Sequence, residues 1–152
     1  MKQELYLLAE DREYITQRID ELEQEILDMG PEFHDALYQS NETWHDNAPF
    51  DAARDKQSVL AAEQQKLRRI LREATLIKKT SKKGTVQIGS YVELSDGSRY
   101  RVAGDWTHKA GKHADGVTWI SCQAPLAVAL ISKKVGDLVR LGKTVLTITS
   151  CT

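Results

Sequence analysis

The side chains best suited to chemistry or binding gather in one polar segment, residues 40–47. This segment carries two carboxylates, Glu42 and Asp46, with a tryptophan, Trp44, between them. Asp46 has an ordinary alternative role as the capping residue of a following helix, and Glu42 has one as a solvated loop acid. Trp44 could stack on a nucleotide base or simply cover the end of a hairpin, since large exposed aromatic side chains often mark contacts. The segment is the first candidate site, and each member keeps a structural alternative.

Metal-ligating side chains outside this segment do not form a recognisable motif. The spacing of the two histidines and two cysteines in the second half matches no common zinc site. Two cysteines are also too few for a disulfide scaffold. We therefore predict no metal centre from these four residues, which are His108, His113, Cys122 and Cys151.

Length and composition are those of an ordinary folded protein. The chain has 152 residues, of which 41% are hydrophobic and 28% charged, and its formal net charge is −1. This length suits one compact domain or two small units. No apolar run approaches the roughly 18 residues of a membrane span, and the first residues lack the apolar stretch of a signal peptide. We expect a cytoplasmic protein.

The small net charge hides a strong asymmetry along the chain. Residues 1–50 hold 13 acids and 3 bases, whereas residues 51–84 hold 4 acids and 10 bases. An acidic segment followed by a basic one can neutralise itself by folding back. The alternative is a basic surface that attracts nucleic acid. Candidate members of such a surface are Arg54, Lys56, Lys66, Arg68, Arg69 and Arg72.

A seven-residue repeat predicts an antiparallel coiled-coil hairpin over residues 1–79, with its tip at about 40–47. Nine of the ten repeat positions in the first helix are apolar, with Arg12 as the exception. Such a sustained repeat places one apolar stripe on a helix and favours coiled-coil packing. Gly30-Pro31 predicts a kink or brief break, because proline lacks the donor N–H. The repeat positions are Leu5, Leu8, Arg12, Ile15, Ile19, Leu22, Ile26, Met29, Phe33 and Ala36 in the first helix, and Phe50, Ala53, Gln57, Leu60, Gln64, Leu67, Leu71 and Ala74 in the second.

After a linker at 80–84, residues 85–152 predict a small β-rich domain. Alternating patterns predict strands around Val86–Ile88, 91–94, 100–102, 117–121, 139–141 and 144–149. Asp96-Gly97 predicts a hairpin turn, because both residues tolerate positive φ. Residues 125–131 predict a short helix with proline in its first turn. We therefore expect an α+β fold with one short helix on an antiparallel sheet.

Three stretches of the chain together resemble the bacterial GreA and GreB transcript-cleavage factors. The run 46–55 (DNAPFDAARD) is similar to the start of that family's second coiled-coil helix. The run 86–92 (VQIGSYV) is similar to its opening strand after the linker. The run 124–137 (APLAVALISKKVGD) resembles its Ser-Pro-Ile-Ala-x-Ala-Leu-x-Gly-Lys-x-x-Gly-Asp segment. The order and spacing of the three fit along essentially the whole chain.

The resemblance implies an FKBP-like C-terminal domain that docks beside the secondary channel of bacterial RNA polymerase. It implies that the coiled coil enters the channel and that acidic tip residues help to hold a Mg²⁺ shared with the polymerase. Asp46 stands at one of the family's two acidic positions, and Glu42, one residue beyond the other position, is a candidate substitute. The polymerase then hydrolyses the 3′ end of backtracked RNA, and the factor, expected as a monomer with no stably bound cofactor, is not an enzyme by itself. Hard oxygen ligands suit Mg²⁺, and two metals can stabilise both attacking and leaving oxygens.

The chain departs from the family pattern at both contact regions. Cleaving members carry two acids three residues apart at the tip, but Thr43 stands three residues before Asp46, and Asp46 is one methylene shorter than the family's glutamate. In the docking loop, Gln123 and Ala124 replace an acid or amide and a serine. The resemblance places partner contacts at Asn47, Gln123, Ala124, Pro125 and Leu126. Trp44 is a further candidate for a partner contact from its residue type, and Arg54 and Lys56 are candidates for contact with RNA from their charge.

Three other functions stay open at this stage. A related factor could enter the channel and inhibit or modulate the polymerase without cleavage. A coiled-coil adaptor would explain the hairpin but not the match at 124–137. An FKBP-like fold also suggests prolyl isomerase activity, although fold does not carry function and this half has few aromatic residues for a proline pocket.

Overall fold

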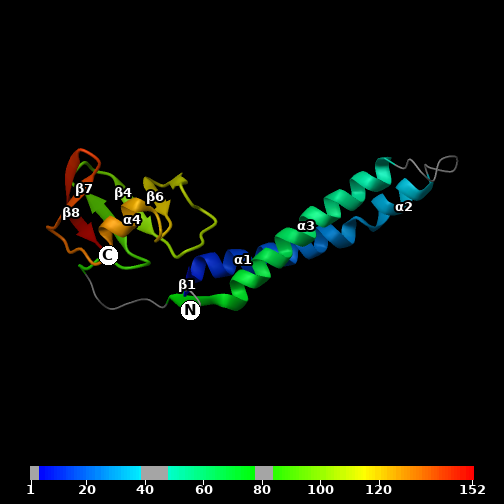
Figure 1. Cartoon of the computed structure of the whole chain (residues 1–152), viewed down its shortest axis with the longest axis horizontal. Helices are drawn as coiled ribbons and strands as arrows, with labels where there is room; N and C mark the ends of the chain where they lie inside the picture. Colours follow the sequence, from blue (N-terminus) through cyan, green and yellow to red (C-terminus); the bar gives the residue numbers. More distant parts are fainter. Residues whose placement is uncertain (1–3, 39–47, 78–83) are drawn as a thin grey trace. The chain divides into compact units, whose positions relative to one another are not determined.

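The computed structural model describes residues 4–38, 48–77 and 84–152. The fold is α+β, with a long bent helix near the N-terminus and a C-terminal sheet rich in antiparallel pairs (Figure 1). None of the described helices is both long and apolar enough to cross a membrane. The elements are β1 (Leu5–Leu8), α1 (Ala9–Asp28), α2 (Gly30–Tyr38), α3 (Ala48–Glu73), β2 (Ala74–Ile77), β3 (Tyr91–Leu94), β4 (Arg99–Val102), β5 (His113–Ala114), β6 (Val117–Ile120), α4 (Pro125–Leu130), β7 (Leu138–Leu141) and β8 (Thr144–Cys151).

The chain divides into two compact units. Residues Glu13–Arg72 form one, here termed the helical unit. Met1–Arg12 together with Glu73–Thr152 form the other, here termed the globular unit. The first residues of the chain therefore belong to the same unit as the C-terminal sheet. The predicted linker at 80–84 lies outside the described residues except for Gly84.

The helical unit is an antiparallel pair of helices. Arg18 of α1 contacts Glu63 of α3, and Glu32 of α2 contacts Lys56. Residue numbers rise along one helix as they fall along the other, which defines the antiparallel direction. The break predicted at Gly30-Pro31 is confirmed, because α1 ends at Asp28 and α2 begins at Gly30.

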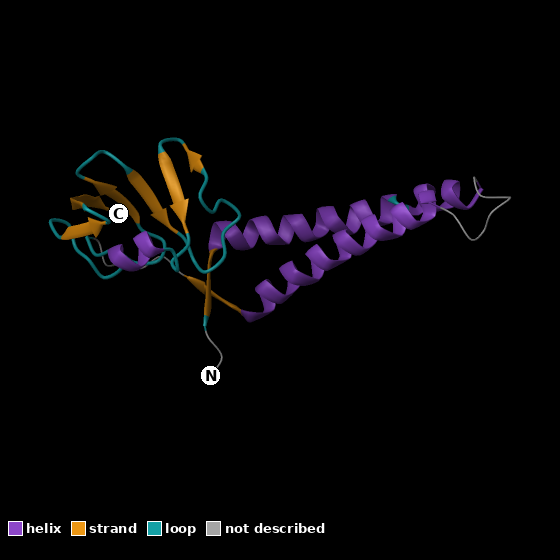
Figure 2. Ribbon diagram, turned by 45° about the horizontal axis from the view of Figure 1, so that its top comes forward, coloured by secondary structure: helices purple, strands orange, loops and turns teal. Residues whose placement is uncertain are grey.

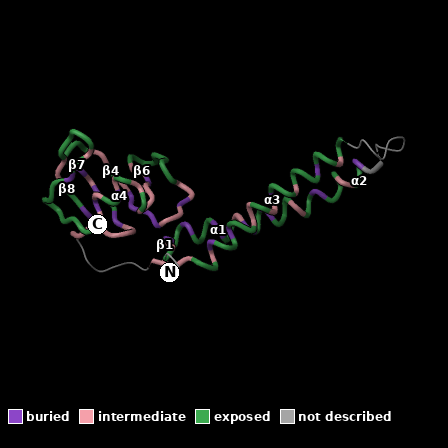
Figure 3. Tube along the Cα trace, viewed as in Figure 1, coloured by how far each residue is buried: buried purple, intermediate pink, exposed green. Residues whose placement is uncertain are grey.

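The facing sides of these helices carry the buried residues of the helical unit (Figure 3). They coincide with predicted repeat positions in both helices, apart from Ile70. The rings of Phe33 in α2 and Phe50 in α3 also pack edge to face, with their centroids 5.5 Å apart, which stabilises the helix pair. On the seam, the Gln64 side chain donates to the Ile19 carbonyl oxygen at 3.4 Å. The buried positions are Ile15, Ile19, Leu22, Met29, Ala36, Ala53, Leu60, Leu67 and Ile70.

The prediction of helix at both ends of the repeat is wrong. Leu5–Leu8 and Ala74–Ile77 are strands that pair in parallel, with Leu5 opposite Ala74 and Leu8 opposite Ile77. Leu5–Leu8 is a run of consecutive apolar residues that fits the seven-residue spacing only at Leu5 and Leu8. Such a short apolar run suits a buried strand as well as a helix, and tertiary contacts choose between them.

In the globular unit, a six-stranded sheet has the order β5-β6-β4-β3-β8-β7. Figure 2 draws its strands in orange. The predicted turn at Ser95–Ser98 and the predicted short helix at 125–131 are confirmed, the latter as α4. The expectation of a fully antiparallel sheet is wrong, because β4 and β6 pair in parallel. The long connection between these strands allows it, since parallel neighbours need a crossover of about a dozen residues.

The strand predicted at Val86–Ile88 is also not formed. Val86 exchanges backbone hydrogen bonds with the turn after α4, at Ser132 and Lys133, each with a length of 2.8 Å. Thr85 makes an isolated bridge to Lys134. The backbone of this segment is therefore satisfied by the turn that follows α4 and not by a neighbouring strand.

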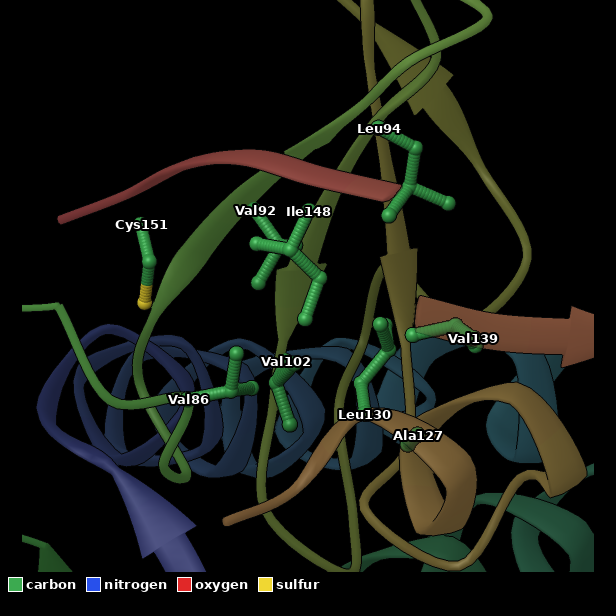
Figure 4. Close-up of a cluster of buried hydrophobic side chains, with 9 residues drawn as sticks. All are labelled: Val86, Val92, Leu94, Val102, Ala127, Leu130, Val139, Ile148 and Cys151. Carbon is green, nitrogen blue, oxygen red and sulfur yellow. The ribbon is translucent and has the colours of Figure 1, made fainter. Parts of the chain in front are cut away.

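Among its described residues, the globular unit has two clusters of buried apolar side chains. The larger has nine buried residues, and Figure 4 shows Ala127 and Leu130 of α4 reaching into it. The smaller consists of Leu8, Ala103 and Trp119. Because Leu8 belongs to β1, the N-terminal strand contributes directly to the core of the globular unit. The nine residues are Val86, Val92, Leu94, Val102, Ala127, Leu130, Val139, Ile148 and Cys151.

Candidate functional site

The segment 121–126 consists of the connection from β6 to α4 and the first two residues of α4, and its residues alternate between half-buried and exposed positions from Cys122 to Leu126. Cys122, Ala124 and Leu126 are half-buried and pack against the larger apolar cluster. Gln123 and Pro125 are exposed. The three half-buried residues hold the segment against the core, and the two exposed residues between them face solvent. We name residues 121–126 the docking segment.

Asp105 is the polar centre beside the docking segment. Its Oδ1 accepts a hydrogen bond from the Gln123 side-chain amide at 2.5 Å, and its Oδ2 accepts one from the Tyr6 backbone N–H at 2.6 Å. Its backbone carbonyl accepts from the Ser121 hydroxyl at 3.4 Å, and that hydroxyl accepts from the Gln123 N–H at 3.2 Å. Gln123 is therefore held through both its backbone and its side chain.

The backbone around Asp105 lies directly against β1. The Asp105 N–H donates to the Tyr6 carbonyl oxygen at 2.8 Å. A Cβ atom on Gly104 would lie 2.1 Å from that oxygen, so a larger residue has no room there. Only glycine permits this approach of two backbones.

Burial and a nearby negative charge alter the acidity of the Cys122 thiol, next to Gln123. Burial, together with the charge of Asp105 and a hydrogen bond to it, raises the pKa of Cys122 to about 11. The thiol is therefore protonated and unreactive near neutral pH. Nearby, the carboxylate of Glu4 accepts a hydrogen bond from the Tyr6 hydroxyl and, more than any other group, raises the pKa of Tyr6.

A hollow of about 360 Å³ opens beside this network. It is lined by Glu4, Leu5, Asp105 and Gln123. The N-terminal strand thus forms part of the surface that surrounds the docking segment. This contribution could not be found from the sequence, because about 100 residues separate Leu5 from Asp105.

A second polar cluster ties the first turn of α1 to the sheet. Asp11 is fully buried, and its Oδ1 accepts from the Thr107 hydroxyl at 3.0 Å and from the His108 N–H at 3.2 Å. The same oxygen lies 2.6 Å from Nδ1 of His108. Beside it, Arg101 pairs with Glu10 at 3.1 Å. Sequence reasoning missed this cluster, because Asp11 looked like one more acid on a charged helix.

Arg101 is also enclosed by aromatic rings. Its guanidinium carbon lies 4.3 Å from the Tyr91 ring centroid and 5.5 Å from that of Trp119. These distances allow cation–π attraction with both rings. The cluster joins α1, β3, β4 and β6 of the globular unit.

The four residues considered for a metal are not brought together. His108 contacts Asp11, and His113 contacts the Thr118 hydroxyl at 2.9 Å. Cys122 and Cys151 are free thiols. Within the described ranges, no group of three or more His, Cys, Asp or Glu residues is arranged to hold a metal ion. This part of the structure supplies no geometry for a metal centre.

The predicted tip residues Glu42, Trp44, Asp46 and Asn47, with Thr43, lie outside the described residues. Their roles therefore stay predictions.

Arg54 and Lys56, predicted to contact RNA, are exposed on α3. Arg54 pairs with Asp51 at 3.5 Å, and Lys56 pairs with Glu32 of α2 at 3.5 Å. The Lys56 pair is of the kind predicted for a self-compensating hairpin. Further along α3, Lys66, Arg68 and Arg72 are exposed and form no ion pair with another described residue.

Comparison with known proteins connects the docking segment to one family. A model of the family described as "Transcription elongation factor, GreA/GreB, C-term" matches residues 81–151. The chain is 31% identical over 101 residues to a protein of Staphylococcus saprophyticus named transcription elongation factor GreA, with 63% of this chain and 61% of that protein covered. It is 33% identical over 102 residues to the protein of that name from Macrococcus caseolyticus, with 63% and 61% covered.

The match thus spans about 61% of the length of these curated relatives. Among solved structures, GreA factor homolog 1 of Thermus thermophilus is 21% identical, with 99% of both chains covered and a TM-score of 0.45. The matched residues 81–151 include all of the docking segment and α4. The chain is therefore similar to the GreA/GreB family over its C-terminal residues 81–151, and to a GreA factor over 63% of its length.

Proposed function

We propose that the chain is a GreA/GreB-type transcription elongation factor that binds bacterial RNA polymerase. The observation that supports this most is the family match over 81–151, which contains the docking segment. In the structure, Gln123 and Pro125 of that segment are exposed while their neighbours are anchored in the core. A rigid segment with outward side chains suits a preformed contact with a large partner.

The same proposal includes the finer features of the fold. The helical unit is taken as a coiled coil, because the buried Ile15, Leu22 and Met29 recur every seven residues. The C-terminal domain is taken as FKBP-like, and the factor as a monomer that acts in the cytoplasm. The relatives' names, which refer to transcription elongation, agree with a factor that acts in the cytoplasm.

For activity, we propose that the factor promotes cleavage of the 3′ end of backtracked RNA by the polymerase. Asp46 would be the principal acid at the tip, with Glu42 as its partner. Their carboxylate oxygens suit a Mg²⁺ ion that the polymerase active site shares, and no cofactor need be bound to the free factor. The factor would then be an accessory protein and not an enzyme by itself.

A second candidate function rests on Thr43. This residue stands three positions before Asp46, where the cleaving pattern needs a second acid. Without that acid, the factor would occupy the secondary channel and inhibit or modulate the polymerase without cleavage. Adaptor and prolyl isomerase functions are not favoured by the comparisons, which point to elongation factors.

The test is a cleavage assay on a stalled elongation complex at low Mg²⁺ concentration. The proposal expects release of short 3′ RNA fragments, loss of them in Asp46→Ala, and retention in the control Asp20→Ala, which removes an exposed acid of α1. Slower elongation without fragments, together with fragment release by Thr43→Asp, would support the second candidate. No binding to RNA polymerase would contradict both.

A further inference from the structure

We propose that Asp105 is a positioning residue, which holds Gln123 of the docking segment in the orientation presented to the polymerase and ties it to β1. This inference rests on the proposed function, because it takes the docking segment as the contact with RNA polymerase. Asp105 lies outside the docking segment, and β1 lies near the N-terminus. The inference adds both to the parts of the chain that determine binding to RNA polymerase.

The two carboxylate oxygens of Asp105 have different partners. Oδ2 accepts the Tyr6 backbone N–H at 2.6 Å, and Oδ1 accepts the Gln123 side-chain amide at 2.5 Å. Both are hydrogen bonds to a charged acceptor, which are stronger than neutral ones. One side chain thus bridges β1 and the docking segment.

The position of Asp105 is itself fixed by β1. Its N–H donates to the Tyr6 carbonyl oxygen at 2.8 Å, so Tyr6 binds both the backbone and the side chain of Asp105. The close approach at Gly104 keeps this contact tight. Loss of β1 would therefore release Asp105, and with it the amide of Gln123.

The bridge gives a physical reason for glutamine at position 123. A carboxylate there would face the carboxylate of Asp105 within hydrogen-bond distance, and like charges this close repel each other. A neutral amide instead donates a proton to it. The negative charge beside the docking segment is supplied by Asp105, while Gln123 supplies the oriented amide. The raised pKa of Cys122 agrees with that charge.

The test uses two substitutions that break and then restore the bridge in the full chain. Gln123→Glu places two carboxylates against each other and should weaken polymerase binding by about tenfold, the lower range for a lost hydrogen bond to a charged group. Asp105→Asn alone should change binding little, because the Gln123 amide can turn over and accept a hydrogen bond. The double variant Asp105→Asn/Gln123→Glu pairs an amide donor with a carboxylate and should restore binding to within about threefold of the wild type.

Two controls distinguish an effect of the Gln123 orientation on binding from an effect of lost charge or lost stability. Asp115→Asn removes the same charge at another exposed position of the globular unit and should leave binding unchanged. Nitrogen-15 NMR of the Gln123 side-chain amide reports the bridge without the polymerase. The proton donated to Asp105 should exchange with solvent more slowly in the wild type than in Asp105→Ala.

The outcomes are distinct. Rescue of Gln123→Glu by Asp105→Asn, with a protected Gln123 amide in the wild type, supports the proposal. Failure of the rescue, wild-type binding by Gln123→Glu, or an unprotected amide overturns it. If wild-type protein does not bind RNA polymerase, the proposed function fails, and the positioning role fails with it. The NMR signal then shows whether the bridge itself exists.

Discussion

The carbonyl oxygen of Tyr6 lies 2.1 Å from the place that a Cβ atom on Gly104 would occupy. The backbones of β1 and of the segment after β4 therefore touch with no space for a side chain. This contact joins residues nearly 100 positions apart and fixes the N-terminal strand to the globular unit. It also holds the backbone that carries Asp105.

The first prediction concerns this contact. Gly104→Ala should lower the free energy of unfolding of the globular unit by about 2–4 kcal/mol, because backbone and not a flexible side chain must move. Chemical denaturation measures it. Gly30→Ala is the control, since nothing lies within 4 Å of a Cβ there, and it should cost little or nothing. Equal effects of the two substitutions would contradict the tight approach.

A second prediction tests whether β1 belongs to the core. Leu8 is 3% exposed and packs with Ala103 and Trp119, so Leu8→Ala should cost about 2–4 kcal/mol of stability. Leu27→Ala removes the same atoms from a side chain that is 67% exposed and should cost under about 1 kcal/mol. Urea denaturation compares the two variants. A similar small cost for both would show that β1 does not pack on the sheet.

A third prediction concerns the turn after α4. Ser132 has φ of 72°, in the left-handed region that favours glycine. Ser132→Gly should stabilise the protein by about 0.5 kcal/mol, because relief of about 1–2 kcal/mol of strain exceeds the entropic cost of glycine in the unfolded chain. Thermal unfolding measures the change. Ser132→Ala keeps the Cβ and should give no gain, and a gain as large as that of glycine would refute the strain argument.

A fourth prediction follows from the Cys122 thiol. Its pKa is raised to about 11, so the folded state favours the protonated form. Its contribution to stability is complete below the pKa of an unfolded cysteine, about 8.5, and is lost as pH rises through about 11. The stability difference between wild type and Cys122→Ala should therefore shrink across that range. A difference independent of pH would contradict the assignment.

The same thiol reports on Asp105. Asp105→Asn removes the charge and weakens the hydrogen bond that help to raise the Cys122 pKa, so alkylation of Cys122 at pH 8 should become faster. The control is Asp115→Asn, which should leave the alkylation rate unchanged. An unchanged rate in Asp105→Asn would mean that burial alone protects the thiol.

Local patterns were reliable where the contacts that decide structure are close in sequence. The helix break at Gly30-Pro31, the turn around Asp96-Gly97 and the proline-started α4 were all predicted, because each follows from the φ preferences or missing donors of a few adjacent residues. The buried stripe of the helical unit was predicted for a similar reason, since its spacing follows from helix geometry. The docking segment was located by its resemblance to a family motif.

Other features depend on partners that are distant in sequence. Leu5–Leu8 fits a helical repeat and a strand equally well, and its pairing with Ala74–Ile77 and its contact with Gly104 decide for the strand. Nothing in the sequence around Asp11 indicates that it is buried, because its partners Thr107 and His108 lie almost 100 residues away. The parallel pairing of β4 with β6 likewise depends on how the long connection between them crosses.

The sequence by itself determined the helical repeats, the turns, α4 and the resemblance to one family, because these depend on residues that lie close together along the chain. Only the tertiary structure decided that the N-terminal strand completes the globular unit and that Asp105 holds Gln123. Hydrogen bonding and burial act between atoms that are close in space, and no pattern along the chain records which distant residues folding brings within reach.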